Sequence, residues 1–322
     1  MSENPLSSLL KTAGTLFIGA VGIGIVYSQT MVDHNMTLPN ALDAERRELT
    51  TPETGRLSYY VDTSGEGRPL VLIHSINAAA SAYEMKPLFE AYQGQRPVYA
   101  LELPGFGFAE RTDRRYSPEL YTASITTFLE QVVGEPADVI ALSLGSEFAA
   151  MVALAQPDQI TTLTLLSPTG LNASPPEIPE QTLYNIFSFR LWAQPFYDLL
   201  ASHASIRLFL GRNFAGDPAD DMIDYAHATA HQPGARYAPL YFLSGQLFTS
   251  DVRTAVYNNL TVPTLVLYDR DPNVSFDKLP DVLATNDNWQ ATRIPDTLGL
   301  PHWEKLEETT AALAAFWAGQ AE

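Results

Sequence analysis

Short apolar runs alternate with helix-like segments over most of this 322-residue chain, and this alternation limits the folds open to it. The runs at 69–75, 97–105 and 138–145 are rich in Val, Leu, Ile and Tyr and end in turn-forming residues. Segments with helical periodicity, such as 118–133 and 304–317, lie between these runs or follow them. Strands joined by helical crossovers predict an α/β fold with a mostly parallel central sheet and helices on both faces.

The alternation breaks once, between about residues 170 and 260, where aromatic-rich helical stretches replace the strand-like runs. We therefore predict that this segment is an inserted helical lid over the sheet. The predicted organisation is an N-terminal hydrophobic segment (1–34), a core formed by 35–169 and 261–322, and the lid (170–260).

The charge balance excludes one broad class of partner. The chain carries 37 acidic and 19 basic residues, so its formal charge is −18. Such a surface repels nucleic-acid phosphates, and we expect no nucleic-acid partner. Cysteine is absent, which excludes disulfides, thiolate nucleophiles and cysteine-type zinc sites.

The N-terminal segment contains a stretch without charge, residues 12–32, that is just long enough to form one membrane-spanning helix of about 20 residues. We predict a single N-terminal hydrophobic helix that anchors the protein to a membrane. A cleaved signal peptide or a helix docked on the protein's own surface are the alternatives, which would make the protein secreted or cytoplasmic. Lys11 on one flank and Arg46 and Arg47 on the other leave the side of the membrane open.

A serine interrupts an apolar stretch at a predicted strand-to-helix turn. Ser143 follows the apolar run 139–142 and precedes the helix-like segment 145–155. The pattern A-L-S-L-G resembles the nucleophile elbow G-x-S-x-G of the α/β-hydrolase family, with Ala141 in place of the first glycine. A simple helix N-cap is the alternative role for this serine.

The resemblance implies an acid and a histidine further along the chain, in that order. Asp271 follows an apolar strand where the family has its acid, with Asp269 as the alternative because the local register is ambiguous. A turn without catalytic function would also suit these aspartates. His302 lies in a loop ahead of the last helix, where the family has its general base. The glycine that usually precedes this histidine directly is here two residues further back, at Gly299.

The loop after the first buried strand resembles the oxyanion loop of the same family. His74 and Ser75 stand where the family has a His-Gly pair, so Ser75 replaces the glycine. By position, the backbone N–H groups of Ile76 and Leu144 are the two oxyanion donors. We expect His74 to be a structural residue that hydrogen-bonds the loop.

The resemblance implies a serine hydrolase that forms an acyl-enzyme. Ser143 would attack a carbonyl carbon, His302 would take its proton, and Asp271 would stabilise the resulting imidazolium. No cofactor is implied. A serine at the elbow argues against the dehalogenases and epoxide hydrolases of the family, which use aspartate there. The aromatic lid predicts a small apolar ester-like substrate.

Two further functions remain open from the sequence. The departures at Ala141, Ser75 and the loop before His302 are compatible with a non-catalytic protein that binds small molecules. Within enzymes, a carbon–carbon bond hydrolase or a cofactor-free haloperoxidase would use the same serine triad.

One histidine pair has the spacing of metal ligands on a helix. His227 and His231 are four residues apart, but the glutamate of the zinc-protease pattern is absent. We expect these histidines to form structural hydrogen bonds and predict no metal site.

Overall fold

The computed structural model describes residues 22–173 and 181–320, and in this part the chain forms an eight-stranded sheet. The strand order is β1-β2-β4-β3-β5-β6-β7-β8. The pairs β1–β2 and β2–β4 are antiparallel, and the other pairs are parallel, which confirms the predicted mostly parallel sheet. The strands are β1 (Glu45–Thr51), β2 (Gly55–Asp62), β3 (Leu70–Ile73), β4 (Val98–Glu102), β5 (Ala137–Leu142), β6 (Ile160–Leu166), β7 (Thr264–Tyr268) and β8 (Trp289–Arg293).

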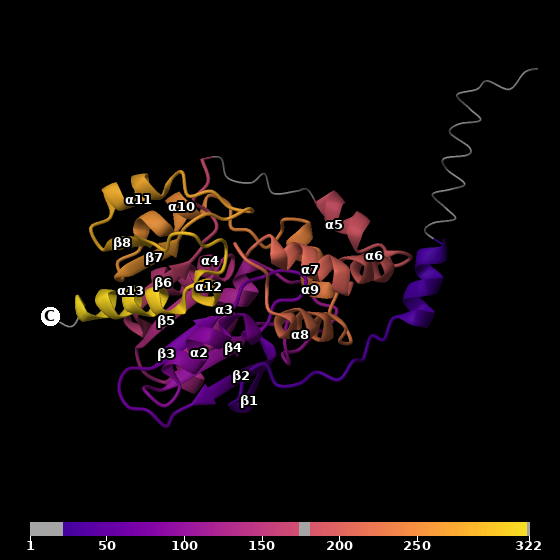
Figure 1. Cartoon of the computed structure of the whole chain (residues 1–322), viewed down its shortest axis with the longest axis horizontal. Helices are drawn as coiled ribbons and strands as arrows, with labels where there is room; N and C mark the ends of the chain where they lie inside the picture. Colours follow the sequence, from indigo (N-terminus) through magenta and orange to yellow (C-terminus); the bar gives the residue numbers. More distant parts are fainter. Residues whose placement is uncertain (1–21, 174–180, 321–322) are drawn as a thin grey trace, which may run out of the picture.

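Helices cover both faces of the sheet (Figure 1). Side chains of β3 alternate between the faces: Leu70 and Leu72 belong to the apolar cluster that includes α2 and α13 residues, and Val71 and Ile73 belong to the cluster that includes α3 and α4 residues. All four are fully buried, as expected for a central parallel strand. The helices of the core are α2 (Lys86–Tyr92), α3 (Pro118–Phe128), α4 (Gly145–Ala155), α11 (Leu279–Thr285), α12 (Pro301–Glu304) and α13 (Leu306–Ala318).

Between β6 and β7 the described residues form helices and no strand, in agreement with the helical character predicted for this segment. Figure 1 shows α5 to α9 gathered at one end of the sheet. The helices between β6 and β7 are α5 (Gln181–Phe187), α6 (Ala193–Leu200), α7 (His203–Gly211), α8 (Asp220–Ala230), α9 (Tyr237–Leu243) and α10 (Val252–Ala255).

The N-terminal segment is described only from residue 22. Residues 22–31 form a helix, and the rest of the predicted anchor, 12–21, lies outside the described residues. Among the helices that the structure describes, none is long and apolar enough to span a bilayer. Two contacts connect the chain after this helix to the lid. His34 Nε2 lies 3.0 Å from a carboxylate oxygen of Asp198 in α6, and Gln232 Nε2 donates to the carbonyl of Met36 at 2.7 Å.

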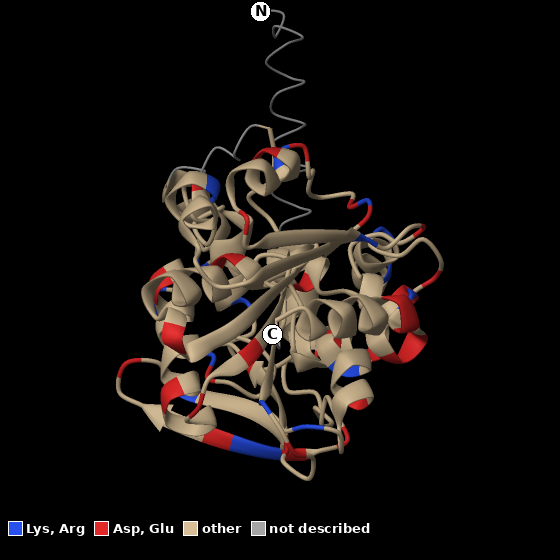
Figure 2. Cartoon of the chain, turned by 90° about the vertical axis from the view of Figure 1, so that its left-hand side faces the viewer, with Lys and Arg blue, Asp and Glu red and all other residues tan. Residues whose placement is uncertain are grey.

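Acidic residues are spread over several helices and loops in the view of Figure 2, where they are red. The chain has 37 acidic and 19 basic residues, which give the formal charge of −18. The acidic residues are therefore not confined to one element.

Candidate active site

The turn between β5 and α4 holds Ser143 in an unusual backbone conformation. Its φ is +51°, and its N–H donates to the carbonyl of Leu166 at 2.9 Å. A left-handed conformation costs a non-glycine residue about 1 kcal/mol or more, so the surrounding structure must impose it. Gly145 explains how the helix can start so close to β3, because a Cβ there would lie 2.4 Å from the carbonyl oxygen of His74. The chain therefore forms the sharp turn predicted from the sequence.

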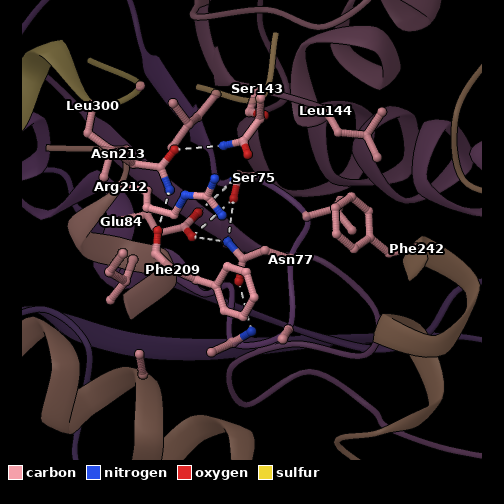
Figure 3. A pocket seen from close by; sticks show the side chains of 18 of the residues that line it. Ser75, Asn77, Glu84, Ser143, Leu144, Phe209, Arg212, Asn213, Phe242 and Leu300 are labelled. Atoms are coloured by element: carbon pink, nitrogen blue, oxygen red, sulfur yellow. Dashed lines mark hydrogen bonds between the residues drawn. The ribbon is translucent and has the colours of Figure 1, made fainter. Parts of the chain in front are cut away.

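Ser143 lines a cavity of about 480 Å³ between the sheet and the lid. Much of the cavity wall is apolar, which agrees with the expected preference for apolar ligands. Figure 3 shows Ser143 and Leu144 on one side of this space and Phe209, Arg212 and Asn213 of the lid on another. The apolar wall includes Leu200, Ile206, Phe209, Met222, Phe242 and Phe248.

The two predicted oxyanion donors, Ile76 and Leu144, both line this cavity. Within the described part of the chain, neither backbone N–H has a hydrogen-bond acceptor. The structure thus brings Ser143 and two unpaired backbone donors to one cavity, an arrangement able to stabilise a negatively charged oxygen.

Glu84 holds the loop that carries Ile76. Its carboxylate accepts hydrogen bonds from the Ser75 N–H (2.9 Å), the Ser75 hydroxyl (3.0 Å) and the Asn77 amide (2.6 Å), as the dashed lines in Figure 3 indicate. Burial raises the pKa of this carboxyl, and the three donors oppose the rise. The sequence does not single out Glu84; the available signal was one acidic residue in the stretch 82–89, where Lys86 is the other charged residue.

His74 has the structural role predicted for it. Its Nε2 accepts from the Leu103 N–H at 3.0 Å, so Nδ1 carries the proton and donates to the Ser75 carbonyl at 2.6 Å. Burial lowers the pKa of the ring to about 4, which keeps it neutral near pH 7. The ring fixes the start of the loop that carries the predicted oxyanion donor Ile76.

Of the two candidate acids, Asp271 lines the cavity. Its Oδ1 accepts from the N–H groups of Asn273 (2.7 Å) and Val274 (3.1 Å), and burial raises its pKa. Asp269 is instead bound to Arg293 at 2.5 Å; burial would raise its pKa, but the hydrogen bond and charge of Arg293 lower it. The geometry therefore favours Asp271 as the acid of this site.

The structure does not bring His302 to Ser143, and this corrects the predicted arrangement. The ring is fully buried at the start of α12, where Nε2 donates to the carbonyl of Glu84 at 2.7 Å. Trp303 Nε1 donates to the same carbonyl at 2.7 Å. Burial lowers the pKa of His302 to about 4. The reason for this position is local. The helical turn that begins at Pro301 directs the His302 ring to the Glu84 carbonyl, outside the cavity lining.

No other histidine replaces it. All six histidines of the chain lie in the described residues, and none lines the cavity. Gly299 and Leu300, just before α12, do line it, and Gly299 lies against Asp271. A Cβ at Gly299 would lie 3.0 Å from Asp271 Oδ2.

His227 and His231, at the end of α8, contact each other. The rings of His227 and His231 stack with centroids 4.1 Å apart, and His231 Nδ1 donates to the His227 carbonyl at 2.7 Å. Within residues 22–173 and 181–320, no group of three potential ligands is arranged to hold a metal ion. These contacts agree with the structural role expected for the pair.

Residues 70–312 match the model of the Alpha/beta hydrolase family. The chain belongs to this family. The predicted family membership is thereby confirmed, over about three quarters of this α/β-hydrolase.

Two curated relatives match the chain over part of their length. A 2-hydroxymuconate semialdehyde hydrolase from a Pseudomonas species is 26% identical over 130 residues, which cover 38% of this chain and 46% of the relative. A pimeloyl-[acyl-carrier protein] methyl ester esterase from Aliivibrio salmonicida is 32% identical over 109 residues, which cover 33% of this chain and 38% of the relative. The matched segments thus span less than half of either relative.

Solved structures share the fold at lower identity. A membrane phospholipase A described as a bacterial virulence factor superposes with a TM-score of 0.65 at 17% identity, over 98% of this chain and 97% of that chain. At this identity the similarity concerns the fold.

Proposed function

We propose that this α/β-hydrolase cleaves an apolar carboxylic ester through an acyl-enzyme on Ser143. The observation that carries the proposal is the strained, left-handed backbone of Ser143 at the wall of the cavity. Such strain costs on the order of 1–3 kcal/mol and clusters at functional sites. A serine that served only as a helix cap would not need this conformation, since caps adopt ordinary extended backbone angles.

The surrounding groups supply the other requirements of acyl transfer. The Ser143 oxygen would attack the carbonyl carbon, and the carbonyl electrons would move onto the oxygen near the N–H groups of Ile76 and Leu144. Collapse of this intermediate expels the alcohol, which takes up the proton lost from the Ser143 hydroxyl. Water then releases the acid from the acyl-enzyme and returns a proton to the serine oxygen. In other enzymes, removing one such donor lowers turnover by roughly 100- to 1,000-fold.

The apolar side chains of the cavity wall support the proposal that the enzyme recognises an apolar acyl group of its substrate. Side chains such as Phe209, Phe242 and Phe248 offer aromatic surface to a ligand in the cavity that Ser143 lines. An ester is also the substrate class in the name of the relative that is 32% identical. Hydrolysis of a carbon–carbon bond remains the alternative within enzymes.

A fluorophosphonate probe tests the nucleophile. We expect slow covalent labelling of the full chain that is lost in Ser143→Ala and kept in Ser167→Ala, because Ser167 also has a left-handed backbone but lies outside the cavity lining. Hydrolysis of p-nitrophenyl acetate, butyrate, octanoate and laurate would then define the acyl preference. Equal labelling of wild type and Ser143→Ala would refute the proposal.

A second candidate function is favoured by one observation, the absence of every histidine from the cavity lining. In that case the protein binds an apolar small molecule without turning it over. It would then show no Ser143-dependent labelling, and a ligand extracted from the purified protein would be recovered chemically unchanged while raising the melting temperature.

We further propose that the lid and the N-terminal helix associate with a lipid surface. The large exposed apolar side chains of the described residues are concentrated on helix 22–31 and on the lid segment 183–209, with Leu154 as the exception. They are Ile23, Val26, Tyr27, Met31, Leu183, Ile186, Phe189, Leu191, Leu199, Leu208 and Phe209. Figure 1 shows this helix beside α6 at one end of the molecule.

The neighbouring sequence supports a membrane as the occupant of this surface. Upstream of residue 22 the chain stays uncharged back to Thr12, and exposed apolar patches of this kind mark interaction sites. Because the chain is strongly acidic, we expect it to prefer zwitterionic lipids.

Co-flotation with phosphatidylcholine vesicles tests the association. We expect the full chain to float with the vesicles and the double variant Ile186→Ser, Phe189→Ser to float less. Leu154→Ser is the matched control, because this residue is also exposed but lies on α4. Equal flotation of the double variant and the control would count against a lid contact.

A further inference from the structure

Asp271 presents an unused carboxylate oxygen beside the cavity. Its Oδ1 accepts from the amides of Asn273 and Val274, but within the described part of the chain Oδ2 has no hydrogen-bond donor and no cation within 4.0 Å. An anionic oxygen in a partly buried position is costly unless a donor or a positive charge approaches it. The oxygen is therefore a candidate partner for a ligand group.

Gly299 lies directly against this oxygen. A Cβ there would lie 3.0 Å from Asp271 Oδ2 and 3.1 Å from Asn213 Oδ1, so any side chain at this position would press on the acid. The φ of Gly299 is not in the left-handed region, so backbone conformation does not require a glycine. The consequence of the glycine is that the cavity extends to the carboxylate.

The other charged groups of the cavity do not pair with Asp271 Oδ2. The Glu84 carboxylate already accepts hydrogen bonds from Ser75 and Asn77. Arg212 lines the cavity but has no acidic partner within 4.0 Å among the described residues, so it does not neutralise Asp271 in this structure. His302 is bound to the Glu84 carbonyl.

We propose that the cavity lined by Asp271 and Ser143 binds an imidazole-type nitrogen base carried by the ligand, with its N–H on Asp271 Oδ2 and its second nitrogen toward Ser143. This inference rests on the proposed function. A neutral aromatic base with a pKa near 6.5 can accept a proton near pH 7, whereas an alkyl amine is already protonated. The chain would thus obtain from its ligand the base that its own histidines do not supply.

The proton transfers balance without any further reactant. As the bond between Ser143 Oγ and the carbonyl carbon forms, the hydroxyl proton passes to the ring nitrogen and Asp271 stabilises the imidazolium. When the intermediate collapses, the ring returns this proton to the departing alcohol. The same ring then takes a proton from the water that attacks the acyl-enzyme and returns it to the serine oxygen.

Free imidazole is the probe for this site. Its binding to the full chain, followed by ligand-observed NMR, should be lost in Asp271→Asn and retained in Asp287→Asn. Asp287 is a suitable control because it is exposed and precedes β8, whereas Asp271 follows the neighbouring parallel strand β7, so the two lie at opposite ends of these strands. Imidazole should also accelerate fluorophosphonate labelling and p-nitrophenyl butyrate hydrolysis, with the Ser143→Ala rate subtracted to remove the reaction of imidazole with the ester itself.

A variant that supplies the base from the chain gives an independent measurement. Gly299→His should raise hydrolysis without imidazole by about 100-fold over Gly299→Ala, the low end of what a positioned general base contributes. Further addition of imidazole should then have little effect. If Gly299→His does not fold, as judged by circular dichroism, the imidazole measurements on the wild type still decide the inference.

The outcomes separate this inference from the proposed function. Labelling of Ser143 that imidazole does not change, together with no Asp271-dependent binding, would overturn the inference and leave the proposed function intact. Asp271-dependent binding without labelling of Ser143 under any condition would support the binding site and overturn the proposed function.

Discussion

His302 donates a hydrogen bond from Nε2 to the backbone carbonyl of Glu84 at 2.7 Å, across 218 residues of sequence. The carboxylate of the same Glu84 holds the Ser75 loop, so one residue links the loop before α12 to the loop of the oxyanion donors. The buried Nδ1 of His302 has no partner in the described part of the chain. This geometry assigns the ring to packing and loop attachment.

Replacing His302 should therefore lower stability and spare the nucleophile. In His302→Ala the lost hydrogen bond and the cavity left behind should cost about 2–4 kcal/mol of unfolding free energy, measured by urea denaturation. His203→Ala is the control, because this histidine is exposed. We expect the folded variant to keep its Ser143 labelling; loss of labelling at unchanged stability would assign His302 to catalysis instead.

The same ring should make stability depend on pH. Burial lowers the pKa of His302 to about 4, against about 6.5 in the unfolded chain. Between these pH values the unfolded chain binds a proton here that the folded chain does not, so this histidine reduces stability as pH falls, by up to about 3 kcal/mol. The wild type should lose more unfolding free energy between pH 7 and pH 4.5 than His302→Gln, which cannot titrate. Parallel losses in both proteins would contradict the assignment.

The left-handed backbone at Ser143 should lower the stability of the folded protein. Because its φ of +51° is costly for any residue with a Cβ, Ser143→Gly should be about 1 kcal/mol more stable than Ser143→Ala. Both variants should be inert to fluorophosphonate. Thermal unfolding of the two variants measures the difference, and a less stable glycine variant would argue against backbone strain at this position.

Gly145 should tolerate no side chain. In Gly145→Ala the new Cβ would lie 2.4 Å from the His74 carbonyl oxygen, so the strand or the helix must move. We expect a loss of more than about 2 kcal/mol or failure to fold. Gly216→Ala is the matched control, because nothing lies within 4 Å of a Cβ there. Similar expression and melting temperatures for the two variants would show that the approach to His74 is unimportant.

Glu84→Gln should disturb the oxyanion loop. The glutamine amide would bring hydrogens toward the Ser75 and Asn77 donors, so at least one buried donor would lose its acceptor, at about 1–3 kcal/mol. We expect the labelling rate of Ser143 to fall by more than this loss of stability explains, since Ile76 follows Ser75 directly. A labelling rate equal to that of the wild type would show that Glu84 does not affect the reactivity of Ser143.

Much of the fold followed from the sequence because its signals are local. In β3, for example, Val71 and Ile73 are buried on one face of the sheet, and Leu70 and Leu72 are buried on the other. A run of consecutive apolar residues predicts such burial on both faces. The sharp turn at Ser143 was predictable for the same reason, since small neighbours at 141 and 145 are needed wherever a strand meets a helix so closely.

The position of a side chain in a loop has no such local signal. Sequence order placed His302 near the end of the core correctly, but whether its ring faces the cavity depends on where α12 begins and on a carbonyl at Glu84. Glu84 was overlooked because its three donors come from a loop that only the folded chain brings to it. The catalytic roles of Ser143 and Asp271 stay predictions.

The sequence by itself thus determined the sheet, the helical lid and the turn that presents Ser143, because periodic burial and small residues at a tight turn are encoded in neighbouring positions. Only the tertiary structure decided that Asp271 faces the cavity, that Asp269 pairs with Arg293 and that Gly299, not a histidine, lies beside the acid. These relationships depend on how distant loops pack against one another. In the chain before α12, a difference of a few positions decides whether a residue lines the cavity, as Gly299 does, or lies outside it, as His302 does.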